Sequence, residues 1–202
     1  MKSMAESLTD VSGLFGRIKA ICISSERGTV KEEIGSARLI ADLGIEGDAH
    51  AGSWHRQVSL LSAFSIDEFN SRGAGVKNGE FGENLVVCGI DLSSLPVGST
   101  LRIGDFDDAP MLCITQRGKE CHSHCRIYER MGDCIMPREG VFAKVIRGGE
   151  IKAGDTVRVS LPDVSRPFQA AVIVLSDKGA AGEREDVSGP EAVRILKEMD
   201  MR

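Results

Sequence analysis

A cluster of thiols and imidazoles lies just past the middle of the sequence. The string from Lys119 to Cys125 reads KECHSHC, and Cys134 follows a short way on. The surrounding residues 116–149 also carry seven of the chain's 25 lysines and arginines. Cysteine reacts and binds metals as the thiolate, which nearby positive charge favours. The segment therefore predicts a thiol that acts as a nucleophile or as a metal ligand.

Two interpretations of this cluster stay open. Cys121 and Cys125 are four residues apart and would share one face of a helix. With His122 and His124 they offer zinc donors, although structural zinc sites use two separated pairs of ligands. The other interpretation is one reactive thiol, Cys121, accompanied by two candidate resolving thiols: Cys125 and Cys134.

Basic side chains near Cys121 would suit an anionic ligand, because arginine forms paired, charge-assisted hydrogen bonds with phosphate. Four candidates surround the cluster or lie in the loop GDAHAGSWHRQVS: Lys119, Arg126, Arg138 and Arg56. That loop also holds Asp48, His50 and His55. The alternative to an anion-binding loop is an ordinary hydrogen-bonded loop in which Arg56 is exposed to solvent.

Further candidate ligand-binding residues are His122 and His124 of the cluster and Asn84. Asn84 follows Glu83 in the string FGENL at a junction between a loop and a strand. Ordinary turn chemistry is the alternative at such a position.

Composition limits the classes of function. The 202 residues are 42% hydrophobic and 27% charged, as in a soluble globular protein, and the net charge of -5 argues against nucleic acid as a partner. The first 13 residues lack the apolar core of a signal peptide, and no apolar run is long enough to span a membrane. We therefore expect a cytoplasmic protein whose six cysteines stay reduced.

Strands dominate the predicted elements, since aromatics are few and the 23 glycines indicate many turns. Cys22 and Cys88 fall on such strands, where a cysteine is usually a small buried hydrophobe. One short helix is expected at residues 63–71, capped by Ser62. The main strands are expected at residues 15–24, 37–43, 57–61, 85–87, 109–116 and 141–146.

Two strand entries resemble one another. GSTLRI at residues 98–103 and GDTVRV at residues 154–159 each follow a glycine turn with an alternating strand. The match is too short for a true repeat. It predicts two similar strands in one β-structure.

The C-terminal part differs in pattern. Residues 162–169 hold two prolines without periodicity and are expected to be a linker. AAVIVLS at residues 170–176 is a continuous apolar run, typical of a strand buried on both faces of a sheet, and a helix is expected from about Pro190. A single βα unit cannot cover its own strand, so residues 170–202 predict only the start of an α/β domain.

Residues 13–161 resemble the MOSC domain family, which is related to the C-terminal domain of molybdenum cofactor sulfurase. The resemblance rests on GIEGDAHAGSWHRQVSLL, FGENLVV, GKECHSHC and GDCIMPREGVFAKVIRGGEIKAGD. It implies a mainly β fold, a closed or partly open barrel with a few short helices. It also implies binding of molybdenum cofactor, a phosphate-bearing dithiolene pterin. The family's essential cysteine, which carries sulfur or ligates molybdenum, corresponds to Cys121.

Residues 170–202 are similar to the start of the molybdopterin adenylyltransferase family, and are too few for that activity. Both resemblances imply a role in molybdenum cofactor handling. The implied partners are molybdopterin, a sulfur donor and a molybdoenzyme acceptor. Sulfur-transfer activity is an open hypothesis; the alternatives are a non-catalytic cofactor carrier and a small zinc-stabilised binding module.

Overall fold

The computed structural model describes residues 15–121, 125–163 and 171–198. The chain divides into two compact units, Met1–Pro162 and Asp163–Arg202. The predicted histidine ligands His122 and His124 lie outside the described residues. Among the described residues, no helix has both the length and the apolar character needed to cross a membrane.

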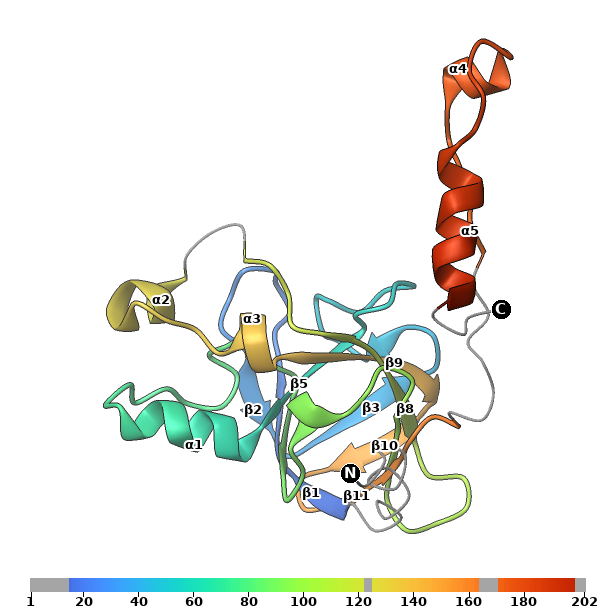
Figure 1. Ribbon diagram of the computed structural model, residues 1–202. Helices are drawn as coiled ribbons and strands as arrows, with labels where there is room; N and C mark the ends of the chain where they lie inside the picture. Colours follow the sequence, from blue (N-terminus) through green and yellow to red (C-terminus); the bar gives the residue numbers. More distant parts are fainter. Residues whose placement is uncertain (1–14, 122–124, 164–170, 199–202) are drawn as a thin grey trace, which may run out of the picture. The chain divides into compact units, whose positions relative to one another are not determined.

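The first unit is built on a closed β-barrel. Within the described residues the strands follow the order β11, β7, β8, β9, β5, β6, β1, and pairing of β1 with β11 closes the ring (Figure 1). These strands are β1 Phe15–Ile23, β5 Val58–Ser62, β6 Leu85–Cys88, β7 Thr100–Ile103, β8 Met111–Arg117, β9 Val141–Arg147 and β11 Thr156–Ser160. The expected barrel is therefore confirmed.

Further short strands extend this unit. Strand β2, Glu32–Ile34, pairs with the end of β1. A small antiparallel sheet has the order β10, β3, β4. Its strands are β3 Ser36–Ile40, β4 Gly44–Ile45 and β10 Gly149–Lys152.

Alternation along the barrel strands produces two apolar clusters. On β9, Val141, Ala143 and Val145 belong to the cluster inside the barrel, whereas Phe142 between them belongs to a second cluster. The same alternation places Leu60 inside and Leu61 in the second cluster. These strands are therefore covered on both faces.

The second cluster lies under three helices on one flank of the barrel (Figure 1). Helix α1, Ala63–Ser71, connects β5 to β6, which run parallel and so require a crossover. The others are the short helices α2, Arg126–Met131, and α3, Met136–Glu139. The 3₁₀ turn η1, Leu92–Ser94, follows β6. The flank that carries the cysteine segment is thus a layer packed on the barrel wall.

Some local expectations are confirmed and others are wrong. The strands predicted at residues 98–103 and 154–159 occur as β7 and β11, and they pair with one another. The second strand ends at Ile40 and not at Leu43, since Asp42 takes a positive φ of 58° in a turn. Ser62 occupies the N-cap position of α1, but its hydroxyl bonds with Ile90 and Leu92 instead of capping the helix.

The second unit contains helix α4, Asp177–Ala180, and helix α5, Ser188–Glu198. Residues 171–176 form no strand, so the predicted βα fragment has only its helix within the described residues. Ile173 and Leu175 are 79% and 91% exposed. A strand needs a partner for its backbone hydrogen bonds, and the described residues of this unit offer no second strand.

Candidate functional site

The cysteine segment leaves the barrel at the end of β8. Gly118 takes a φ of +65° and donates its N–H to the Gly140 carbonyl at 2.6 Å. A side chain at Gly118 would meet the Pro137 carbonyl oxygen at 2.4 Å, so glycine is required here. Lys119 then donates its N–H to Pro137 at 3.3 Å, and Cys121 follows with an exposed side chain.

The six cysteines differ in exposure. Cys121 and Cys125 are exposed, whereas Cys22 and Cys134 are buried and the remaining two are partly buried. Burial, with the charges of Glu83 and Glu33, raises the pKa of Cys22 to about 12, and burial raises the pKa of Cys134. Neither buried thiol is suited to react as a thiolate at neutral pH. The described structure therefore offers Cys121 and Cys125 as accessible thiols.

The short helices place two of the segment's three cysteines. Cys125 is the N-cap residue of α2, and Cys134 lies between α2 and α3 in the second apolar cluster. Burial is the main cause of the raised pKa of Cys134. The charges of Cys125 and Cys121 also raise this pKa, and the charge of Lys119 lowers it. Among the described residues, no group of three or more His, Cys, Asp or Glu side chains is placed to hold a metal ion.

The loop that carries Arg56 lies against the end of β8. His55 Nε2 is 2.8 Å from Gln116 Oε1, and the Thr115 hydroxyl donates to the His55 carbonyl. The Arg56 guanidinium lies over the Trp54 ring at 4.9 Å and the Phe142 ring at 5.7 Å. Its Nε is buried and has no hydrogen-bond partner among the described residues. The loop thus carries a cation beside the strand that delivers the cysteine segment.

The same loop begins in a buried polar network. Asp48 forms an ion pair with Lys31, and both side chains are 1% exposed. Asp48 also accepts hydrogen bonds from the amides of Ser24 and His50 and from Asn84 Nδ2, at 3.2, 2.9 and 3.1 Å. Burial acts to raise the pKa of Asp48, but these bonds, with that of Lys31 first, lower it. Asp48 is therefore ionised inside the fold.

Asn84 belongs to this network. Its amide group donates to the Cys22 carbonyl at 3.0 Å and accepts from Ser59 N at 3.1 Å. The side chain joins β1, β5 and the start of β6, and the residue is 1% exposed. Its hydrogen bonds are used within the protein. Half-buried His50 lies at the edge of the network, and burial, followed by the charge of Lys31, lowers its pKa.

Glu83 is a second buried acid beside this network. It is fully buried; Oε1 accepts the Gly79 N–H at 2.6 Å, and Oε2 has no partner among the described residues. Burial raises the pKa of Glu83 to about 7, although the Gly79 amide acts in the opposite direction. Glu83 therefore changes charge near neutral pH.

The remaining predicted cations lie on the surface of the helical flank. Arg126 begins α2 with an exposed side chain, and Lys119 is partly exposed. Arg138 forms a fork with Asp133, with Nη1 2.8 Å from Oδ1 and Nη2 3.2 Å from Oδ2. Arg72, at the end of α1, donates to the same carboxylate at 3.0 Å. Arg72, Asp133 and Lys31 also form ion pairs, and the sequence alone did not indicate them as candidate site residues.

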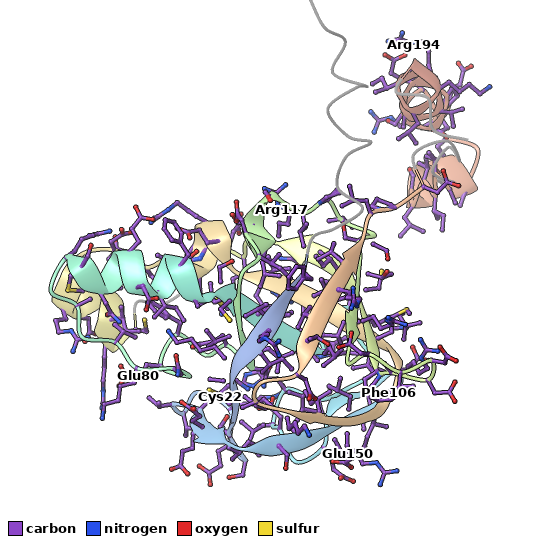
Figure 2. The ribbon with its side chains drawn as sticks, turned by 90° about the horizontal axis from the view of Figure 1, so that it is seen from below. Cys22, Glu80, Phe106, Arg117, Glu150 and Arg194 are labelled. Carbon is purple, nitrogen blue, oxygen red and sulfur yellow. The ribbon has the colours of Figure 1, made fainter. Side chains whose placement is uncertain are left out.

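A separate cleft of about 560 Å³ lies elsewhere on the barrel unit, where residues 104–106 meet residues 150–156. Phe106 and Glu150, two of its lining residues, lie well apart from Arg117, which ends β8 (Figure 2). Its lining mixes both charges, with Arg17 and Lys152 beside Asp105. This cleft does not contain the thiols.

Comparisons with known proteins agree with this architecture. The MOSC domain model matches residues 47–158. The crystal structure of the YuaD protein from Bacillus subtilis has a TM-score of 0.60 at 20% identity, covering 72% of this chain and 95% of that one. The YiiM protein from Geobacillus stearothermophilus has a TM-score of 0.53 at 15% identity, covering 72% and 75%. At such identities the likeness shows the fold alone. None of the curated proteins matches the chain.

Proposed function

Because the chain belongs to the MOSC domain family, we propose that its barrel unit binds molybdenum cofactor or molybdopterin and uses Cys121 to carry sulfur or to ligate molybdenum. The observation that carries the proposal is the position of Cys121. Its exposed thiol follows directly on the turn that anchors Lys119 to Pro137. A thiol at the exit of a barrel strand combines a fixed location with access for a ligand.

The side chains around the end of β8 fit a phosphate-bearing metal group. A thiolate is a soft ligand of the kind that transition metals accept. A phosphate needs N–H donors, and Arg56 presents a buried Nε that lacks a partner among the described residues. Lys119 adds a partly exposed ammonium two residues before the thiol. When bound, the cofactor would supply a molybdenum centre held by dithiolene sulfurs.

The sulfur step uses the chain's own thiol and a persulfide donor. The Cys121 thiolate attacks the outer sulfur of the donor persulfide, and the donor's S–S bond breaks as the new one forms. The donor leaves as a thiolate, and Cys121 becomes a persulfide. No external oxidant is needed, because the outer sulfur moves at an unchanged oxidation level.

The C-terminal motifs support the same pathway. AAVIVLSDKGAAGEREDVSG resembles the opening of the molybdopterin adenylyltransferase family. We therefore extend the proposal to a chain that couples a MOSC unit to part of a second molybdopterin-related unit. The zinc-stabilised alternative depends on His122 and His124, which lie outside the described residues, and it stays an alternative.

The experiment compares two exposed thiols. Wild type, Cys121→Ser and Cys125→Ser are each incubated with a persulfide donor, and intact mass is measured before and after a reducing agent. We expect wild type and Cys125→Ser to gain the mass of one sulfur atom and Cys121→Ser to gain none. Cys125→Ser is a matched control because it removes an equally accessible thiol four residues away.

A second measurement separates sulfur transfer from cofactor carriage. Molybdopterin is titrated into the same three proteins while its fluorescence is followed. Binding without sulfur uptake would identify a carrier, and absence of both in the wild type contradicts the proposed function.

A further inference from the structure

The clearest ligand-like arrangement on the helical flank is the group around Asp133. Its two carboxylate oxygens receive four N–H donors from three residues. Oδ1 accepts from Arg138 Nη1 and from the Cys134 amide, both at 2.8 Å. Oδ2 accepts from Arg72 Nη1 at 3.0 Å and Arg138 Nη2 at 3.2 Å. Converging donors of this kind are how proteins hold an oxyanion.

Arg72 has a side-chain contact besides Asp133, and Arg138 is carried by a packed helix. The Arg72 guanidinium lies over the Phe69 ring at 4.9 Å, and Phe69 packs edge-on against Phe81 in the buried layer. Arg138 is on α3, whose Met136 is 2% exposed in the same layer. Without the Asp133 carboxylate, the Phe69 ring still contacts Arg72, and α3 still fixes the backbone position of Arg138.

The charges and the exposure make the carboxylate exchangeable. Two guanidinium groups face one carboxylate, so the three side chains together carry a net positive charge. The Arg72 and Arg138 side chains are 48% and 56% exposed. An ion pair with this exposure contributes little to stability. A dianion could replace the singly charged carboxylate and balance both arginines.

The group also borders the thiols of the candidate site. The Cys134 amide is one of the four donors, and the charge of Cys134 contributes to the raised pKa of Arg138. The charges of Cys121 and Cys125 in turn contribute to the raised pKa of Cys134. An anion held by the arginines would therefore lie on the same flank as the exposed thiols.

We propose that Arg72, Arg138 and the Cys134 amide form a binding site for a phosphate monoester or phosphate dianion, and that Asp133 occupies this site until the anion displaces it. The assignment to the phosphate of a pterin cofactor rests on the proposed function; the anion site itself does not. The Asp133 side chain then competes with the ligand, which sets a low affinity in the absence of further contacts.

The test uses full-length protein and inorganic phosphate, titrated at constant ionic strength and followed by calorimetry. We expect Asp133→Ala to bind phosphate about tenfold more tightly than wild type, since the competing carboxylate is gone. Asp133→Asn, which keeps the shape and loses the charge, should show an intermediate affinity. Adding Arg72→Ala to Asp133→Ala should remove the gain.

The matched control is Asp105→Ala. Asp105 forms an exposed ion pair with Arg158, with Nε 2.9 Å from Oδ1, and the Thr156 side chain and the charge of Arg102 also act on it. Its removal changes net charge equally, but it breaks a direct ion pair with one arginine, whereas Asp133 has direct ion pairs with two. Equal gains in phosphate affinity for Asp105→Ala and Asp133→Ala, or no gain in Asp133→Ala and Asp133→Asn, overturn the inference.

Titration of molybdopterin identifies the source of the phosphate. If Arg72→Ala weakens binding of both ligands, the site holds the cofactor's phosphate. If Arg72→Ala weakens only the binding of inorganic phosphate, the site binds free phosphate. Sulfur uptake by Cys121 is measured separately, so its failure with an intact Asp133 effect contradicts only the proposed function.

Discussion

Two aspartates in the barrel unit each lie among cations, but they differ in how much of the side chain is exposed to solvent. Asp48 and Lys31 are both 1% exposed, and the amides around Asp48 are fixed by the loop and β1. Asp133 is 26% exposed, with its two arginines about half exposed. A buried charge that loses its partner cannot recruit water, whereas an exposed one can. The first group is thus suited to hold the fold together and the second to exchange its anion.

The largest expected effect is on the buried pair. Asp48→Ala leaves the Lys31 ammonium without its carboxylate in the interior, which costs about 3–5 kcal/mol in the free energy of unfolding. Urea denaturation measures this loss. Asp105→Ala, which breaks an exposed pair, serves as the control and should leave the midpoint almost unchanged. Similar losses in both variants would remove the contrast between buried and exposed pairs.

The next effect is a pH dependence that arises from Glu83. Its pKa is raised from 4.5 to about 7 in the folded protein, so the fold binds this proton more tightly than the unfolded chain. The stabilisation is full below pH 4.5 and is lost as the pH rises to about 7. The loss amounts to at most about 3 kcal/mol.

Glu83→Gln should therefore flatten the plot of unfolding free energy against pH between pH 4.5 and 7. Glu80→Gln is the matched control, since Glu80 is a partly exposed glutamate in the same loop. Its plot should follow that of the wild type. A wild-type protein whose stability rises across this window would show that Glu83 is not the dominant buried acid.

A small effect is expected at Asp133, which is partly exposed. Asp133→Ala should lower the free energy of unfolding by less than about 1 kcal/mol, because its partners are half exposed. The hydrogen bonds from Arg138 and Arg72 lower the pKa of Asp133, so this contribution is present at neutral pH and is lost only in strong acid. A loss as large as that of Asp48→Ala would make the group a structural clamp. The measurement is the same urea titration.

The smallest effect is expected from removing the second unit. A chain that ends after Asp163 should have nearly the same melting temperature as the full chain, because the barrel unit has its own closed sheet and apolar clusters. Calorimetry of both chains tests this. A loss of several degrees would show that residues 164–202 stabilise the barrel.

The parts of the fold that sequence reasoning found are those with local signals. The bounds of α1 and the pairing strands β7 and β11 follow from a capping position, periodicity and glycine turns. The strand expected at residues 170–176 was wrong because a strand depends on a partner, and an apolar run does not say whether one is present. Burial of Cys22 followed correctly from its place on a strand.

The candidate site was found less completely. A cysteine in a basic segment is visible in the sequence, and Cys121 is exposed as a reactive thiol requires. The partners of charged residues are not visible, since Lys31 meets Asp48 and Arg72 meets Asp133 only after the barrel has formed. The prediction that Arg138 binds a ligand stays a prediction, but its ion pair with Asp133 is visible only in the structure. Long-range ion pairs leave no periodic pattern in the chain.

The pairing of β1 with β11 has a consequence for synthesis on the ribosome. Phe15 pairs with Arg158, so the first strand made waits for the last one before the ring can close. Until then the edge of β1 is open to wrong partners, and contacts of such long range form slowly. The ribosome holds back the most recent residues of a growing chain. We therefore expect β11 to leave the exit tunnel and complete the barrel only while the residues that follow it are being made.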